Sequence, residues 1–176
     1  NRRLNRGRIS SVNEGKYIAS IPPYGYNKEK LKGQKGFKLI INPDEEKIVK
    51  IIFKLACNGV GANNIANHIN KLGIKPRKTD VWVSATIRSI IQNPVYYGMI
   101  KWGHRKTEKQ MINGTIYKSR PIHEDYILTR GLHDPIISKE EYDIANKNSK
   151  IKIGKCTPKS LKLENPLAGL VKCSFC

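Results

Sequence analysis

Residues 65–98 constrain the fold most, because two short apolar stripes at helical spacing lie on either side of a basic turn. Gly73 ends the first predicted helix, Ser84 is placed to cap the second, and Asn93-Pro94 ends the second. The stripes repeat at intervals of three and four residues and consist of Ala62, Ile65, Ala66, Ile69 and Leu72, then Ile87, Ile90 and Ile91. The sequence therefore predicts two packed helices joined by a connection of about ten residues.

Two interpretations of this helix pair remain open. A polar second helix beside a packed partner resembles a helix-turn-helix, whose second helix enters the major groove of DNA. The connection is longer than the three or four residues usual in that motif, however. The same periodicity also suits a helical hairpin in any small domain.

The charge distribution favours the nucleic-acid interpretation. The 176 residues carry a formal net charge of +19, of which residues 1–38 carry +8 and residues 71–109 carry +7, whereas residues 39–70 are neutral. Clustered cations gain affinity for duplex DNA because they release its condensed counterions. We therefore expect double-stranded DNA as the partner.

The same composition argues against a membrane role. The sequence has neither an apolar run near the roughly 20 residues that a transmembrane helix needs nor a long helix with a basic face opposite bulky apolar residues. No signal or transit segment is recognisable, and the four cysteines lack the spacing of a disulfide scaffold. We therefore expect a cytoplasmic protein with no membrane contact.

Local signals predict the elements of the first half of the chain. Residues 21–26 contain two prolines and a glycine and cannot be helical. Residues 37–41 have the composition of a short strand. In the signature that follows, Asn42 is the expected helix cap and Glu45 stands three residues after it, as in a capping box.

The second half of the chain shows similar signals. Residues 95–102 have strand composition, and Asn113-Gly114 within residues 111–117 predicts a tight hairpin. Such a hairpin could act as a wing on the DNA backbone, although a solvated loop is the alternative. Ser138 and Glu141 form a second capping box and predict a helix after them.

Cys173-Ser174-Phe175-Cys176 has the spacing of one zinc knuckle, which supplies two of the four ligands of a structural zinc site. Cys156 and the four histidines are not arranged as a second knuckle. We therefore expect Cys173 and Cys176 to be half of a site whose second pair lies outside this sequence, and no well-formed zinc site within it. Two ordinary cysteines are the alternative.

Several motifs follow one another along the chain. They include Pro23-x-Gly25-Tyr26, Asn42-Pro43-x-Glu45, Ile48-Val49-x-x-Ile52-Phe53, Gly59, Ile65-Ala66-x-x-Ile69-Asn70-x-x-Gly73-Ile74, Trp82, Ile87, Ile90-Ile91-x-Asn93-Pro94-x-Tyr96-x-Gly98 and Leu167-x-Gly169-Leu170-Val171-x-Cys173-x-x-Cys176. No single motif is decisive, but the ordered set is specific and covers nearly the whole chain. In this order the motifs resemble those of the large serine recombinases.

The resemblance implies a division into three parts. Residues 1–18 would be the end of a long linker helix, residues 19–130 the DNA-binding recombinase domain, and residues 131–176 the N-terminal part of a zinc ribbon domain. The implied fold class is α+β: a small, mainly helical DNA-binding domain with helix-turn-helix-like helices and short strands or a hairpin, followed by the start of the zinc ribbon.

The implied function is recognition of attachment-site half-sites for DNA integration or excision. In this family a separate catalytic domain carries the nucleophilic serine, and the resemblance does not extend to that domain. We therefore expect this part of a bacterial, phage or transposon recombinase to bind DNA without cutting it. The full-length parent is expected to hold zinc and to self-associate, and this fragment is expected to be a monomer.

Candidate DNA-binding residues follow from charge, side-chain geometry and position. Base edges are expected to meet Thr86 and Arg88, since Arg pairs bidentately with guanine. Tyr24 and Tyr26 either bond to phosphates or pack in the core, and Trp82 suits a core anchor better than a base stacker. The phosphate-binding candidates are Lys75, Arg77, Lys78, Lys101, Arg105 and Lys106, together with Arg2, Arg3, Arg6 and Arg8, which could also reach a narrow minor groove or remain solvated.

Two other classes of protein remain alternatives. An RNA-binding structural protein of ribosomal type would tolerate the charge, but it predicts a dedicated RNA module or stacking aromatic residues on a sheet. A helix-turn-helix transcriptional regulator would need a dimerisation or ligand domain, for which no segment of the sequence has the size.

Overall fold

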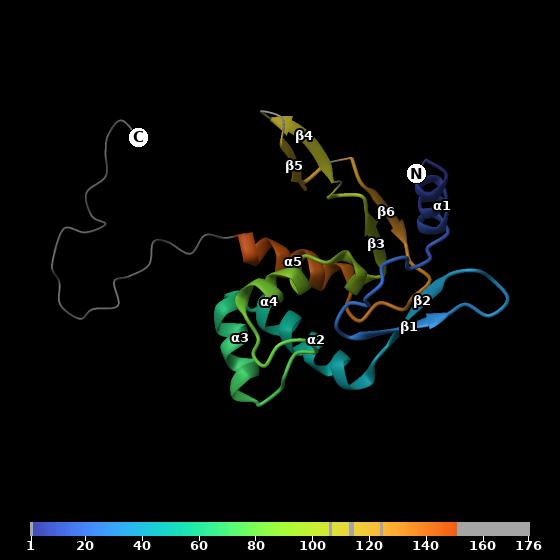
Figure 1. The fold of residues 1–176 in the computed structure, drawn as a ribbon. Helices are drawn as coiled ribbons and strands as arrows, with labels where there is room; N and C mark the ends of the chain where they lie inside the picture. Colours follow the sequence, from blue (N-terminus) through green and yellow to red (C-terminus); the bar gives the residue numbers. More distant parts are fainter. Residues whose placement is uncertain (1, 106, 113–114, 124, 151–176) are drawn as a thin grey trace.

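The computed structural model describes residues 2–105, 107–112, 115–123 and 125–150 (Figure 1). These residues form both helices and short antiparallel strands, in separate runs along the chain, which confirms the predicted α+β class. In chain order the elements are α1 (Arg2–Asn13), β1 (Tyr26–Lys30), β2 (Phe37–Ile41), α2 (Pro43–Cys57), α3 (Ala62–Lys71), α4 (Ser84–Ile91), the short 3-10 helix η1 (Pro94–Tyr97), β3 (Met99–Trp102), β4 (Glu108–Ile112), β5 (Thr115–Ser119), β6 (Ile127–Arg130) and α5 (Lys139–Lys150).

The core lies between α2, α3, α4 and α5, which together form the helical body, and α2 contributes the most buried side chains to it. The apolar stripes predicted for α3 and α4 are buried there, except that Ala62 is half-buried and Leu72 is 52% exposed. α5 packs across α2, and the Asn148 side chain donates to the carbonyls of Ala56 and Cys57 at the end of α2. The fully buried side chains of the helices include Val49, Ile52, Phe53, Ile65, Ile69, Ile87, Ile91 and Ala145.

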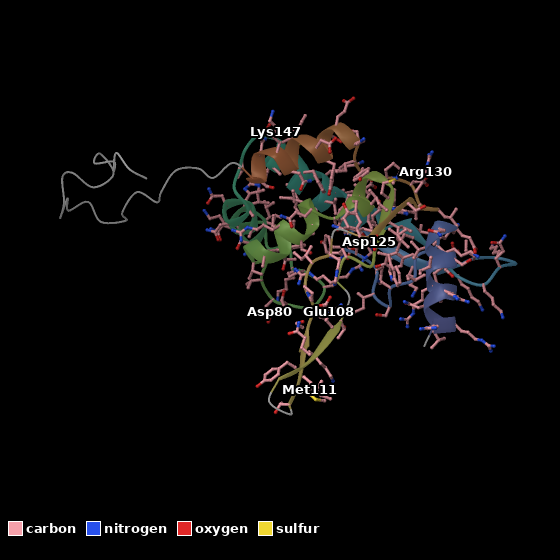
Figure 2. All side chains as sticks on the ribbon, turned by 90° about the horizontal axis from the view of Figure 1, so that it is seen from above. Asp80, Glu108, Met111, Asp125, Arg130 and Lys147 are labelled. Atoms are coloured by element: carbon pink, nitrogen blue, oxygen red, sulfur yellow. The ribbon has the colours of Figure 1, made fainter. Side chains whose placement is uncertain are left out.

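The strands form three separate two-stranded antiparallel sheets. β1 pairs with β2, β3 pairs with β6, and β4 pairs with β5 as the predicted hairpin, in which Met111 lies opposite Ile116. Figure 2 shows Met111 near the far end of this hairpin, which extends away from the helical body. The Asn113-Gly114 turn that prompted the prediction lies outside the described residues.

The two capping signatures have different outcomes. Around Ser138 the reciprocal box is confirmed, because the Glu141 amide donates to Ser138 Oγ (3.1 Å) and the Ser138 amide donates to Glu141 Oε2 (2.9 Å). At α2, Asn42 Oδ1 accepts from the Asp44 amide, as expected. The Asn42 amide, however, donates to the carbonyl of Gly25 instead of to Glu45.

Two local predictions are wrong. α4 begins at Ser84 and its cap position is Val83, so Ser84 is not the cap. Of the strand predicted over residues 95–102, only Met99–Trp102 is extended, because Asn93 caps the 3-10 helix η1 by accepting from the Val95 amide, and Gly98 ends it in a left-handed conformation.

Residues beyond Gly131 contribute to the same core as α2. Ile136, Ile137 and Ala145 belong to its cluster of buried side chains, and the Tyr26 hydroxyl donates to the Asp134 carbonyl at 3.0 Å. The division into domains with a boundary near Gly131 stays a prediction. Within the described residues, α5 packs as part of the helical body.

His133 is a buried polar side chain between the strands and the helices. It is 9% exposed, its Nε2 lies 2.9 Å from the Val95 carbonyl, and its ring meets Tyr26 edge-on. Burial lowers the pKa of His133 below its ordinary value of 6.5. The neutral ring with its proton on Nε2 is therefore the form that fits this site.

This site predicts a pH dependence of stability. Since the unfolded chain binds the His133 proton first as pH falls, the free energy of unfolding should be at its full value above about pH 6.5 and should decrease below it. Urea denaturation at about pH 7.5 and about pH 5.5 measures the effect. His133→Gln keeps an N–H donor for Val95, and this variant should lose part of the pH dependence of the free energy of unfolding. His68→Gln, on the exposed side of α3, is the control and should keep that dependence. Equal pH dependence in the wild type and both variants would contradict the role assigned to His133.

Candidate nucleic-acid interface

The exposed face of α4 is the centre of the candidate interface. The isoleucines of this helix face the core, and Ala85, Thr86, Arg88 and Ser89 are exposed. A helix with one apolar stripe leaves its opposite face free for a partner. Two open grooves run along the sides of this face, and Ser89 and Asn93 line both of them.

The first groove is cationic. It lies between α4 and β3, and it brings Arg88 together with Lys101 and Arg105, which are 13 and more residues away in sequence. Lys101 is held over the ring of Tyr126, 4.3 Å from its centroid. Three of the predicted DNA-binding residues thus line one surface.

His104 lies in the same groove, and the positive charges of the groove affect its pKa. The pKa of His104 is lowered first by burial of the ring and then by repulsion from Lys101, Arg105 and Arg120. A nearby cation disfavours the protonated ring because both carry positive charge. An anion bound in this groove would meet several cations, and the described residues that line the groove include neither Asp nor Glu.

The second groove, on the other side of α4, has a more apolar lining. Its walls are the segment around Pro22 and Tyr24 and the connection between α3 and α4, and Thr86 lies along its edge. Tyr24 packs edge-on against Trp82 with 4.9 Å between ring centroids. Trp82 is 3% exposed, which places it in the core, as the sequence favoured.

The long connection between α3 and α4 is fixed by hydrogen bonds at its end. The Asn70 side chain bonds to both backbone groups of Trp82, accepting from its amide at 2.8 Å and donating to its carbonyl at 2.9 Å. Trp82 Nε1 donates to the Ile74 carbonyl at 3.0 Å. These bonds tie the start of α4 to α3, so the connection has a defined path despite its length.

Arg77 has a structural role in this connection. Its Nε donates to Glu45 Oε1 at 2.5 Å, and its Nη2 donates to Glu45 Oε2 and to the Tyr26 carbonyl. Glu45 Oε2 also accepts from the Gly25 amide at 2.8 Å. The side chains of Arg77 and Glu45 are only 30% and 15% exposed, respectively. Arg77 therefore joins three segments of the fold, and its contact with a phosphate stays a prediction.

The other predicted contacts fall into separate groups. Tyr26 is fully buried, so the expectation that it bonds to a phosphate is wrong for this fold. Lys75 is 72% exposed and pairs with Asp80, and Lys78 lines the second groove. Lys106, Cys173 and Cys176 lie outside the described residues.

α1 lies beside β6, apart from the helical body (Figure 1). Val12 is the buried residue of this helix, and the Leu132 amide donates to the Gly15 carbonyl just after it. The helix is thus anchored at its C-terminal end beside β6. The exposed arginines along it are Arg2, Arg3, Arg6 and Arg8.

Sequence reasoning missed several residues of the interface. Ser89 and Gln92 continue the polar face of α4 and could have been found by counting around the helix from the buried isoleucines. His104 and Arg120 come from irregular segments whose positions depend on tertiary packing. Within the described residues no group of three or more His, Cys, Asp or Glu side chains could hold a metal ion.

A sequence model of the Recombinase family matches residues 43–151. This match covers more than half of the sequence and includes α2 to α5, whereas part of the lining of each groove comes from residues before it. The chain belongs to the Recombinase family.

Two solved structures resemble this recombinase chain in fold. One comes from work on the sequence requirements of the Listeria innocua prophage attP site and has a TM-score of 0.56 and 20% identity, covering 83% of this chain and 50% of the other. The second, a crystal structure of a complex between a large serine recombinase (LSR) and DNA, has a TM-score of 0.58 and 19% identity, covering 84% and 41%. The recombinase chain thus spans half or less of the length of either protein.

An acidic membrane surface, like DNA, would attract a chain as basic as this recombinase chain. Across the part that the structure describes, every helix is too short or too polar to cross a lipid bilayer. The longest, α2, has 15 residues.

The contacts of Arg77 predict its effect on stability. Arg77→Ala should lower the free energy of unfolding by about 1–3 kcal/mol, because it leaves the poorly exposed Glu45 carboxylate without its charged donor. Denaturant unfolding at neutral pH measures this change. Lys75→Ala in the same connection is the matched control and should cost less than about 0.5 kcal/mol, since its pair with Asp80 is solvent-exposed; equal effects of the two substitutions would contradict the role assigned to Arg77.

Proposed function

We propose that this chain is the DNA-binding part of a site-specific serine recombinase and that it recognises the half-sites of an attachment site during integration or excision. The observation that carries the proposal is the gathering of Arg88, Lys101 and Arg105 beside the exposed face of α4. Membership of the Recombinase family supports it, and so does the DNA bound by one of the proteins of similar fold.

The proposed complex places α4 in the major groove of the duplex. An α-helix fits the width of that groove, and its exposed side chains then face the base edges. Arg88 reaches a guanine from the cationic side of the helix, and Thr86 meets a base edge from the other side. Lys101 and Arg105 bind phosphates next to the first groove, and Lys78 binds a phosphate next to the second.

Two further elements extend this contact along the duplex. The exposed arginines of α1 provide a second row of cations for phosphates or a narrow minor groove. The β4–β5 hairpin projects from the body and acts as a wing on the DNA backbone, with Lys118 exposed on it. Each would add affinity without reading sequence.

The proposal includes a zinc ribbon after the recombinase domain. Cys173 and Cys176 lie outside the described residues, and two thiolates at this spacing fit the ligand set of structural zinc. They would supply half of the site, and the metal would stabilise the ribbon without taking part in chemistry. We further propose that the fragment is a monomer, that the full-length parent self-associates, and that it acts on DNA in a bacterial cytoplasm.

RNA binding is the alternative function, and it predicts a particular kind of sheet. Common RNA modules stack bases on the aromatic residues of a four-stranded sheet. The sheets of the described residues have two strands each, and their exposed aromatic residues Phe37 and Tyr117 lie on two separate sheets. These features favour DNA over RNA. Competition between duplex DNA and structured RNA in a gel-shift assay separates the two.

The proposed function predicts how Arg88 contributes to sequence recognition. Arg88→Ala should weaken binding to the preferred duplex by about 1–3 kcal/mol and relax the preference at one base pair, because the bidentate contact to guanine is lost. Fluorescence anisotropy with duplexes from the ends of the parent element, compared with random duplex, measures both effects. Equal loss of affinity for specific and random DNA would remove Arg88 from base recognition.

The second prediction concerns the phosphate contacts. Binding should weaken linearly in a plot of log affinity against log salt concentration, with a slope of about −0.9 for each phosphate contact. Arg105→Ala should reduce the magnitude of this slope by about 1 for every sequence. Lys147→Ala is the control, because Figure 2 shows Lys147 on the side of the body away from the hairpin and Asp80; an affinity that salt does not alter would contradict the proposed function.

A further inference from the structure

The centre of the exposed face of α4 is a stripe of three residues that the proposed function leaves unused. Ala85, Ser89 and Gln92 are spaced by four and three residues, so they share one side of the helix, opposite the buried isoleucines. All three are exposed and line the cationic groove. Thr86 and Arg88 lie on the two flanks of this stripe.

The side chains of this stripe differ from those around it. Ala85 and Ser89 are small, so the helix backbone can come close to a partner at the middle of α4. Gln92 carries a neutral amide, which donates and accepts hydrogen bonds. Its backbone is fixed, because its amide donates to the Arg88 carbonyl and its carbonyl accepts from the Tyr142 hydroxyl at 2.9 Å. The Gln92 side chain therefore extends from a well-defined position.

The charges around the stripe define what it would meet. Arg88, Lys101 and Arg105 line the same groove as this stripe, whereas the three residues of the stripe carry no charge. In a protein–DNA contact most cations bind phosphates, and neutral donors, acceptors and methyl groups are suited to the base edges, which Arg can also read. The stripe has the chemistry of the second kind, since it offers a methyl group, a hydroxyl and an amide.

On the basis of the proposed function, we propose that the stripe of Ala85, Ser89 and Gln92 selects A·T base pairs in the major groove. The Gln92 amide pairs with N6 and N7 of an adenine, and the Ala85 methyl contacts the C5-methyl of a thymine. Ser89 between them leaves room for the helix to approach. Ala85 and Gln92 are separated by roughly 10 Å along the helix axis, which matches roughly three base-pair steps.

The test is a change of base preference caused by an isosteric substitution. Wild-type protein is used to select duplexes from a randomised library, and the selection is repeated with Gln92→Glu. Because a carboxylate accepts from N4 of cytosine, the preferred base at one position should change from adenine to cytosine by roughly tenfold. Gln34→Glu, an equal charge change at an exposed site in the loop between β1 and β2, should leave the preference unchanged.

The outcomes separate this inference from the proposed function. Gln92 is exposed, so thermal melting should show that both variants fold as the wild type does. If Gln92→Glu lowers affinity for every duplex alike and the adenine preference remains, the inference is wrong while DNA binding stands. If the wild-type protein enriches no duplex and binds none in a salt-dependent way, the proposed function itself fails.

A second measurement addresses the thymine contact directly. The selected duplex is made with thymine and with deoxyuridine, which differ only in the C5-methyl group. Loss of one methyl contact should weaken binding by about fourfold at the position facing Ala85. Equal affinity for the two duplexes would remove Ala85 from the proposal.

Discussion

The ion pair between Arg77 and Glu45 is the interaction on which the presentation of α4 depends. Glu45 stands in the first turn of α2, Arg77 in the connection before α4, and the same carboxylate binds the Gly25 amide. The pair thereby holds both walls of the second groove against the helical body. A connection of this length would otherwise retain much of its conformational entropy, and ordering it only when a partner binds would reduce the affinity for that partner.

The parts of the fold that the sequence predicted are those determined within one or two helical turns. The isoleucine spacing of α4, the stop at Gly73 and the Ser138–Glu141 box each involve residues three or four apart, which meet in any helix. The hairpin of β4 and β5 followed in the same way from a two-residue turn signal. In these segments the tertiary structure agrees with the local preference, so the local pattern was sufficient.

Two of the wrong predictions, the Ser84 cap and the strand at residues 95–98, misread local signals. The others concern residues whose partners are distant in sequence. Glu45 had the position of a capping-box residue, but Gly25 and Arg77 compete for its carboxylate, and the Asn42 amide finds the Gly25 carbonyl instead. Tyr26 is buried because residues beyond Gly131 pack over it, 108 positions away at Asp134. The same limit applies to the candidate interface, since Arg88 and Lys101 could be named from charge, whereas their position in one groove depends on how β3 packs beside α4.

The cationic groove gathers like charges in the free protein. Burial lowers the pKa of His104 most, and Lys101, Arg105 and Arg120 lie close enough to lower it further. A phosphate bound in the groove would offset this local positive field and would also gain the counterion release. The neutral stripe of Ala85, Ser89 and Gln92 would act differently, because uncharged side chains add little to the non-specific attraction. Their hydrogen bonds and methyl contacts would instead select the DNA sequence.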